Sequence, residues 1–437
     1  MKQSRYTVSA TDADGATILY NTLTQALAVC PDGVSAQDAP SLAEEGLFVA
    51  DDADEVTALR ARYARDCATT ENFCLAIAPT LECNYACPYC YEREVKHAGL
   101  MSTATQDALV AWIERNFKAL GSSKLKILWY GGEPLMGLSV IERVSALLLE
   151  AGLPLEATAI SNCGLVTPEV AAKLAACKVQ RVTATLDGVG ATHDAHRPTL
   201  SGKPSFDAII AGLGNLLEAG IEVGCLFNED RGNSAEYDQL KAYLDQTLPQ
   251  VELTASQVFD YCQCLDKCAD FTREKYDLFT DPQEFALRQY QRSVAAYGLS
   301  DQLLASLMTP LRLFCSRQAH TYFVIDEAGR LYECDGDVGY TDRALGSIFD
   351  DQLPAHAPYD PFVDPLCESC AYLPLCMGNC RWTRDCIGAS CATKKAIIQE
   401  VLHDWRTLLD EGGEGVRILR PATNPDLEGT EPYTLWL

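Results

Sequence analysis

The pattern of apolar and polar positions changes period repeatedly through the middle of the chain. Short apolar runs typical of buried strands lie at residues 73–80, 124–130, 156–162, 180–188, 221–229 and 251–259, and segments of helical spacing lie between them, at 103–120, 139–150, 168–177, 206–219 and 234–246. Strands that alternate with helices predict a parallel barrel with its chemistry on the loops at the carboxyl ends of the strands. Because a closed barrel usually takes about eight such units, we expect an α/β fold with a partial (β/α)6 TIM barrel, open on one side.

The segments on either side of this repeat have a different pattern. Residues 1–72 hold short apolar patches, a helical-looking stretch at Thr22–Leu27 and the acidic Asp51–Glu55, which leads into a helix. After the barrel a helix is expected near 282–299, and residues 321–334 have strand character. A chain of 437 residues exceeds the usual size of one core. We expect a small N-terminal α+β domain (1–72), the barrel (73–262), a bridging region (263–310) and a cysteine-rich C-terminal domain (311–437).

Composition and charge limit the class of protein. Hydrophobic residues make up 48% of the chain and charged residues 22%, without an apolar run long enough to cross a bilayer or an apolar stretch behind the first basic residues. We therefore expect a soluble cytoplasmic protein that does not enter a membrane. A net charge of −26 disfavours nucleic acid and anionic lipid as partners. In a reducing compartment, the 20 cysteines predict metal ligands or redox groups before disulfides.

The first cysteine group follows the first barrel strand directly. Cys83, Cys87 and Cys90 form a C-x3-C-x2-C loop with an aromatic residue before the last cysteine. Three thiolates on one loop can hold three irons of a cubane cluster and leave the fourth iron free to chelate a small molecule. A structural zinc site is the alternative, but it needs a fourth ligand, for which His97 is the nearby candidate. The loop resembles the signature of the radical S-adenosylmethionine (SAM) enzymes.

The second strand ends in a motif that fits the same family. Gly131, Gly132 and Glu133 are similar to its GGE motif, in which backbone and acid bind the amino group of the SAM methionine. Glycines allow a ligand to approach the backbone, and a carboxylate pairs with an ammonium group. By itself the motif could equally be a turn.

The third and fourth strands end in further candidate SAM contacts. Ser161 and Asn162 are candidates for the ribose, with a capped turn as the alternative, and the glycine that many relatives have next is displaced by one position here. Asp187 and Arg197 lie in stretches similar to the S-L-D-G and H-D-x-x-R pair of the family. Arg197 is a candidate for the SAM carboxylate, and a salt bridge to Asp187 or Asp194 is the alternative.

A second cysteine system lies near the C-terminus, and its spacing is too regular for chance. It resembles the SPASM extension of radical SAM enzymes, which carries two auxiliary 4Fe-4S clusters. The resemblance implies Cys315, Cys334 and Cys380 on the first cluster and Cys367, Cys370, Cys376 and Cys391 on the second, with Cys386 competing for the last place.

One departure concerns the first auxiliary cluster. Sulfatase-maturing relatives have a further cysteine before the position of Cys315, and residues 307–314 contain none. The cluster would then be open at one iron, bind a substrate thiolate, or take a ligand from Cys262, Cys264 or Cys268. The six remaining cysteines are expected to be small core residues: Cys30, Cys67, Cys74, Cys163, Cys177 and Cys225.

The resemblance implies an enzyme with three 4Fe-4S clusters and SAM, whose 5′-deoxyadenosyl radical abstracts hydrogen from a peptide. We expect a maturase of a ribosomally made precursor peptide with a leader, forming a thioether from cysteine to carbon. Residues 1–72 would be a winged-helix peptide-recognition (RRE-like) domain, and a flavodoxin or ferredoxin the reductant. An anaerobic sulfatase-maturating enzyme that makes formylglycine is the alternative, and a non-catalytic iron–sulfur protein is disfavoured by the two motifs. Asp335 follows Cys334 as the base of sulfatase maturases does, and is a candidate catalytic base or a turn cap.

Overall fold

The computed structural model describes residues 1–11, 15–30, 33–35, 38–257, 282–298, 307–354, 359–380, 389–408 and 417–419. The chain forms two compact units, which we describe separately. The barrel unit comprises Ala68–Phe279 and Ala319–Ala357 together with the last residue, and the flanking unit comprises Met1–Cys67, Thr280–Gln318 and Pro358–Trp436. Residues 319–357 thus belong with the barrel, and the N-terminal residues form one unit with C-terminal segments, a division that differs from the expected domain boundaries.

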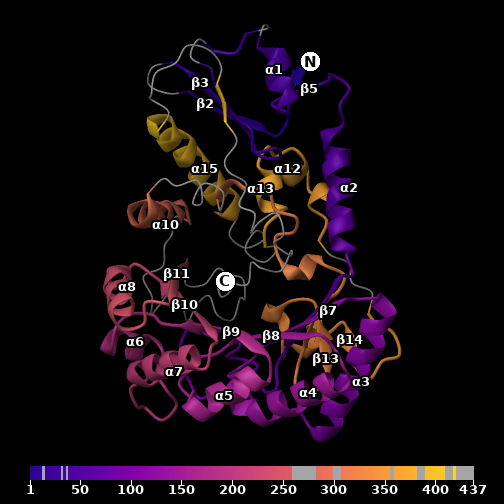
Figure 1. Cartoon of the computed structure of the whole chain (residues 1–437), viewed down its shortest axis with the longest axis vertical. Helices are drawn as coiled ribbons and strands as arrows, with labels where there is room; N and C mark the ends of the chain where they lie inside the picture. Colours follow the sequence, from indigo (N-terminus) through magenta and orange to yellow (C-terminus); the bar gives the residue numbers. More distant parts are fainter. Residues whose placement is uncertain are drawn as a thin grey trace. The chain divides into compact units, whose positions relative to one another are not determined.

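Six parallel strands form the centre of the barrel unit (Figure 1). They are β6 (Asn72–Ile77), β7 (Lys124–Trp129), β8 (Leu155–Ile160), β9 (Val179–Thr185), β10 (Glu222–Glu229) and β11 (Glu252–Gln257). The main helices between them are α3 (Thr103–Leu120), α4 (Leu138–Glu150), α5 (Pro168–Ala176), α7 (Phe206–Glu218) and α8 (Glu236–Thr247), with the short α6 (Ala191–His196) and a 3-10 turn η1 (Pro134–Gly137). The expected partial α/β barrel is confirmed.

Local sequence explains the bounds of these elements. Helix α3 begins where the Ser102 hydroxyl accepts a hydrogen bond from the Thr105 amide, and it ends at Gly121, which adopts the left-handed conformation. Strand β6 is buried along its whole length, as expected of a parallel strand covered on both faces. The hydrophobic core of the barrel unit includes Trp112 and Trp129, which are both fully buried.

The sheet continues past β6, on the side that the six-unit pattern leaves open. Strand β12 (Tyr322–Ile325) pairs with β6 in parallel, and β13 (Arg330–Tyr332) and β14 (Gly346–Ser347) extend the sheet in antiparallel fashion. The sheet order is therefore β11-β10-β9-β8-β7-β6-β12-β13-β14. This places residues 333–340, which follow β13, in the same unit as the barrel loops.

The flanking unit contains a four-stranded antiparallel sheet of order β15-β4-β3-β2. Its strands are β2 (Thr7–Thr11), β3 (Thr17–Asn21), β4 (Leu27–Cys30) and β15 (Arg417–Leu419). Thr22–Leu27 comprises the turn between β3 and β4 and the first residue of β4, so the expected helix there is wrong. Asn21 explains the turn, because its side-chain oxygen accepts hydrogen bonds from the amides of Leu23 and Thr24.

Helices cover both faces of this small sheet. Helices α10 (Pro282–Tyr297) and α15 (Ala389–Leu408) contribute Tyr290, Ile398 and Leu402 to a core with Ile18 and Tyr20. Helix α1 (Ala39–Glu44) contributes Leu42 to a second core, which the other face of the sheet lines. The unit also holds α2 (Glu55–Cys67), the pair β1 (Lys2–Gln3) and β5 (Phe48–Val49), and the short turns η2 (Ser316–Gln318), η5 (Pro361–Val363), α12 (Pro365–Glu368) and α13 (Leu373–Cys376).

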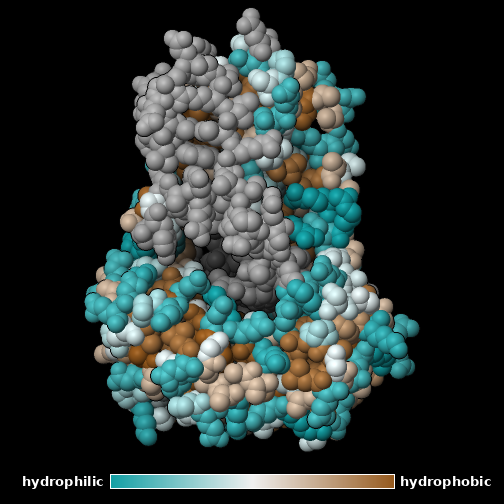
Figure 2. All heavy atoms as spheres, in the orientation of Figure 1, coloured by the Kyte–Doolittle hydropathy of each residue, from teal (hydrophilic) through white to brown (hydrophobic). Residues whose placement is uncertain are grey.

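The surface of the barrel unit carries both hydrophilic and hydrophobic residues (Figure 2). Hydrophilic residues dominate the coloured surface of the barrel unit in Figure 2, with smaller hydrophobic areas between them. Among the helices of the described segments, none combines the length and apolar character that a bilayer span requires.

Candidate active site

The loop after β6 brings the first three predicted cluster ligands together. Cys83 and Cys87 are 9% and 8% exposed, and Cys90 is partly buried. They lie close enough to one another and to the Lys96 ammonium to affect its protonation. Burial lowers the pKa of Lys96, but the Cys90, Cys83 and Cys87 thiolates raise it overall. Burial raises the pKa of Cys90 to about 12, and Lys96 acts against this shift. Burial also raises the pKa of Cys83, so a bound metal would be needed to hold Cys83 and Cys90 as thiolates at neutral pH.

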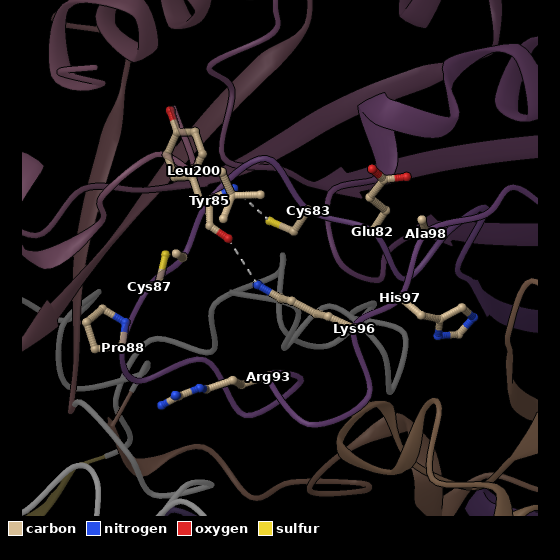
Figure 3. A pocket seen from close by; sticks show the side chains of 11 residues that line it. Glu82, Cys83, Tyr85, Cys87, Pro88, Arg93, Lys96, His97, Ala98 and Leu200 are labelled. Atoms are coloured by element: carbon tan, nitrogen blue, oxygen red, sulfur yellow. Dashed lines mark hydrogen bonds between the residues drawn. The ribbon is translucent and has the colours of Figure 1, made fainter. Parts of the chain in front are cut away.

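A pocket of about 400 Å3 adjoins two of these thiols, Cys83 and Cys87. Arg93 and Lys96 also line it, and Figure 3 shows the Lys96 side chain extending across it toward the Tyr85 carbonyl, at 3.4 Å. A loop with three soft thiolate donors, two of them beside such a pocket, fits a cubane iron–sulfur cluster with one iron left for a ligand. No three Cys, His, Asp or Glu side chains of the described segments converge on a single-ion site.

His97, the candidate fourth ligand for zinc, is engaged elsewhere. One ring nitrogen lies 3.0 Å from the Val95 carbonyl oxygen, and the other 3.0 Å from Glu327 Oε1. The ring is half exposed and forms an ion pair with Glu327 when protonated. His97 therefore makes its contacts with Val95 and Glu327 at the surface of the loop.

Gly131 and Gly132 allow the end of β7 to pack directly on the cluster loop. A Cβ atom at Gly132 would lie 2.3 Å from the Glu82 carbonyl oxygen and 2.6 Å from that of Leu81. At Gly131 it would lie 2.6 Å from the Thr80 carbonyl oxygen, and φ is +104°. Both glycines are therefore required by backbone packing, and this explains them whether or not a ligand approaches.

Glu133 joins the ends of β7 and β8. It is 1% exposed, and its carboxylate accepts hydrogen bonds from the Ser161 hydroxyl at 2.7 Å, the Asn162 amide at 2.7 Å and the Leu135 amide at 3.0 Å. Burial raises the pKa of Glu133, while these hydrogen bonds act in the opposite direction. The structure therefore brings three of the predicted SAM contacts, Glu133, Ser161 and Asn162, into one network.

The turn after β8 explains the displaced glycine of the third motif. Asn162 accepts a hydrogen bond from the Gly164 amide at 3.0 Å and donates to Asn84 Oδ1 of the cluster loop at 2.7 Å. Cys163 has a φ of +58°, a conformation in which glycine is usually found. Gly164 leaves room for Tyr85, because a Cβ there would lie 2.4 Å from the Tyr85 hydroxyl oxygen. Asn162 thus caps the turn, and it also positions the cluster loop.

Tyr89, the aromatic residue of the cysteine loop, links Asp187 and Arg197. Its hydroxyl donates to Asp187 and accepts hydrogen bonds from Arg197 Nη1 at 2.6 Å and from Asn228 Nδ2 at 3.0 Å. Burial raises the pKa of Asp187, and Arg197 acts against this shift. Arg197 thus reaches Asp187 through the tyrosine, and its buried Nε has no hydrogen-bond partner among the described residues. Asp194, the other expected partner, instead accepts from the Ser205 and Phe206 amides at the start of α7.

Asp335 lies in a buried polar region of the barrel unit that the sequence did not predict. The Tyr322 hydroxyl donates to its carboxylate. Burial raises the pKa of Glu92 to about 7; Lys96 acts against this shift, and Asp335 and Glu133 add to it. Burial raises the pKa of Tyr130, with a further contribution from Asp335. Glu92 is two residues beyond Cys90, and Tyr130 directly precedes Gly131, but no periodic pattern marked either of them.

The auxiliary cysteines divide between the two units. Burial raises the pKa of Cys376 to about 12, and the charges of Cys370, Cys391 and Cys367 add to the shift; all four cysteines belong to the flanking unit. Cys334 belongs to the barrel unit, and Cys315 and Cys380 belong to the flanking unit. Cys262, Cys264, Cys268 and Cys386 lie outside the described residues. The six cysteines expected in the core are all buried, which confirms that prediction: Cys30, Cys67, Cys74, Cys163, Cys177 and Cys225.

The fold and the cysteine loop agree with a radical SAM domain. Residues 77–228 match the family model of the Radical SAM superfamily, as the motifs predicted. Among curated proteins, the chain is 33% identical over 156 residues to the Fe-coproporphyrin III synthase of Methanosarcina barkeri, covering 35% of this chain and 36% of that protein. It is 24% identical over 326 residues to the serine-type anaerobic sulfatase-maturating enzyme of Klebsiella pneumoniae, covering 68% of this chain and 78% of that protein. The first of these matches spans only about a third of its relative, and the two names describe different reactions.

Two solved structures share the fold over most of the chain. One is anSMEcpe with bound AdoMet and the Cp18Cys peptide, with a TM-score of 0.61 and 18% identity, covering 78% of this chain and 98% of that chain. The other is Streptococcus suis SuiB bound to the precursor peptide SuiA, with a TM-score of 0.51 and 12% identity, covering 87% and 95%. These likenesses cover more of the chain than the barrel and show a shared fold.

Proposed function

We propose that this protein is a radical SAM maturase that modifies a residue of a peptide or protein. The observation that carries the proposal is that the loop after β6, which contains Cys83, Cys87 and Cys90 and borders a pocket, is joined by hydrogen bonds to the loops after β8 and β9. In a parallel barrel, the carboxyl ends of the strands are where active sites lie.

Cys83, Cys87 and Cys90 would hold the cluster, and SAM would bind over the neighbouring strand ends. When both are bound, the cluster and SAM would supply the chemistry: one-electron cleavage of SAM, which gives a carbon radical that abstracts hydrogen. Glu133 and Asn162 fix the loops that surround this position. The unpartnered Nε of buried Arg197 is a donor suited to the SAM carboxylate.

A peptide substrate is supported by the two similar structures, each of which has a peptide bound. In the flanking unit, β2 pairs only with β3 within the described residues and so forms an edge of the small sheet. An extended leader can add to such an edge through backbone hydrogen bonds. Residues 1–72 would then recognise the leader, and strand β15 covers the opposite edge, on β4.

We favour thioether formation on a cysteine of a ribosomally made precursor. The absence of a cysteine in residues 307–314 leaves room at the first auxiliary cluster for a substrate thiolate. Formylglycine formation is the second candidate, and the similarity to the Klebsiella pneumoniae enzyme together with Asp335 next to Cys334 favours it. Either route would use three 4Fe-4S clusters and a flavodoxin or ferredoxin as reductant.

Co-expression with the neighbouring reading frames tests the proposal. If a short cysteine-containing peptide is the substrate, mass spectrometry should show a loss of two hydrogens and a cysteine that no longer reacts with iodoacetamide. A hydrazide-reactive aldehyde at Cys or Ser of a sulfatase would instead establish the second candidate. Reductive SAM cleavage without modification of any co-expressed peptide or sulfatase would contradict the proposed function.

A further inference from the structure

We propose that Glu92 and Tyr130, beside Asp335, form a subsite that binds a hydrogen-bond-donating side chain of the substrate peptide, with Lys or Arg the best fit. This inference rests on the proposed function, because it assigns residues to the recognition of a peptide. It concerns the barrel unit alone, to which all three residues belong.

Both Glu92 and Tyr130 are buried with an unused polar atom. Glu92 is 6% exposed, and Tyr130 is 5% exposed. Glu92 Oε1 and the Tyr130 hydroxyl have no hydrogen-bond partner among the described residues. Buried polar groups in folded proteins are nearly always paired, because an unpaired one loses its hydration without compensation. Two such atoms near the candidate active site therefore point to a ligand as their missing partner.

The surrounding loops hold these groups in one region. Glu92 lies on the cluster loop, Tyr130 at the end of β7, and Asp335 directly after Cys334. The segment that follows Asp335 packs on the cluster loop: the Tyr340 hydroxyl donates to the Tyr91 carbonyl oxygen at 3.1 Å. Glu92 and Asp335 therefore lie on two segments that pack on each other, and Tyr130 lies at the strand end that packs on the cluster loop through Gly131 and Gly132.

Nearby Gly339 tightens the same packing. A Cβ atom at Gly339, whose φ is +84°, would lie 2.8 Å from Val95 Cβ and 2.9 Å from Leu81 Cδ1. The turn after Cys334 therefore packs closely on the cluster loop, and a side chain at position 339 would force the two apart.

The hydrogen-bonding capacity that remains determines what can bind. The Glu133 carboxylate is taken up by Ser161, Asn162 and Leu135, and the Asp335 carboxylate accepts from Tyr322. Glu92 Oε1 remains as an acceptor, and the Tyr130 hydroxyl remains as a donor or acceptor. A carboxylate removed from water is best satisfied by a charged donor, and Lys and Arg carry such donors with none of the competing acceptors.

The test uses the reconstituted protein and the precursor peptide found by co-expression, prepared with each Lys and Arg of its modified segment replaced in turn by Gln. Glu92→Gln and Tyr130→Phe keep the shape of the side chains, and Glu94→Gln, exposed on the same loop, is the matched control. Iron content and the EPR spectrum of each reduced variant report whether the fold and clusters are intact.

We expect Glu92→Gln to raise the KM for the peptide about tenfold, with a smaller effect on kcat, and Tyr130→Phe to raise it less. With the wild-type enzyme, replacement of one particular Lys or Arg of the peptide by Gln should raise KM by a similar factor. With the Glu92→Gln enzyme, the same peptide replacement should raise KM little further, because two changes that remove the same direct contact are not additive. Glu94→Gln should match the wild type.

Two results would overturn the subsite while the proposed function stands: an unchanged KM in both variants, or full additivity between Glu92→Gln and every Lys or Arg replacement. A modified segment that contains neither Lys nor Arg would also overturn it. A wild-type protein that cleaves SAM but modifies no peptide would overturn the proposed function, and the subsite with it.

Discussion

At the scale of single residues, Tyr89 connects the cysteine loop to three other segments of the barrel unit. Its hydroxyl binds Asp187 after β9, Asn228 of β10 and Arg197 after α6, so one atom fixes the cysteine loop against the barrel. The motifs identified Asp187 and Arg197 from the sequence, but the role of Tyr89 required the geometry, because its partners are about 100 residues away in the chain. Glu92 and Tyr130 were missed for the same reason.

Tyr89→Phe should destabilise the protein by about 3 kcal/mol, because it removes a hydrogen bond to a buried carboxylate and leaves Asp187 without this donor. Tyr237→Phe is the control: it removes one neutral hydrogen bond to the Leu253 carbonyl oxygen, at 3.2 Å, and should cost about 1 kcal/mol. Urea unfolding under anaerobic conditions measures both. Equal losses would show that the Tyr89 network contributes no more than an ordinary hydrogen bond.

His193 should make the stability of the protein depend on pH. Burial lowers the pKa of His193 from 6.5 to about 3, and its Nδ1 accepts a hydrogen bond from the Asp187 amide. The unfolded chain therefore binds a proton more readily than the folded chain as the pH falls below 6.5. This contribution to stability is complete above pH 6.5 and decreases toward about pH 3.

In His193→Asn, which keeps an acceptor near the position of Nδ1, the decrease in unfolding free energy between pH 7 and about pH 5 should be smaller by about 2 kcal/mol. Parallel stability curves for the wild type and the variant would contradict a neutral, buried His193.

At the scale of elements, the sequence predicted most of the barrel because periodicity is local. The six strands and their helices agree with the expected segments within a few residues. Two features of the fold depend on interactions that periodicity does not reveal. Thr22–Leu27 forms a turn because Asn21 binds the backbone ahead of it, and β12 joins the sheet through pairing with β6, far away in sequence. Helical spacing and strand character cannot reveal which distant strands pair.

Gly132→Ala tests the packing of β7 on the cluster loop. The added Cβ would meet the carbonyl oxygens of Glu82 and Leu81, which belong to the backbone and cannot rotate away. We expect the loop to shift, with a loss of most iron from the SAM-binding site and a lower unfolding midpoint. Gly214→Ala in α7 is the control, since a Cβ there would meet only Leu248 Cδ2 at 3.8 Å. Full iron content in Gly132→Ala would show that this packing is not required.

At the scale of the whole molecule, the division into units was the least predictable feature. The sequence suggested consecutive domains, but N-terminal strands share a core with α10 and α15, and residues 319–357 belong to the barrel unit. The assignment of Cys367, Cys370, Cys376 and Cys391 to one cluster, by contrast, is a prediction from their spacing. Ligand spacing is imposed by cluster chemistry, whereas the partners of a strand are set by the whole chain.

Iron and sulfide analysis tests the proposed set of clusters. The anaerobically reconstituted protein should contain about twelve irons per chain, as three cubanes require. Replacement of Cys83, Cys87 and Cys90 together by Ala should remove about four of them and abolish 5′-deoxyadenosine formation with dithionite. A wild-type content of about eight irons would remove one auxiliary cluster from the assignment.

The most direct test of the central claim is the EPR spectrum of the reduced protein with and without SAM. The difference between the wild type and the variant lacking Cys83, Cys87 and Cys90 isolates the signal of the cluster on that loop. If this cluster has an iron that binds SAM, its signal should change when SAM is added, and the signals that remain in the variant should not. An isolated signal that is identical with and without SAM would contradict the account.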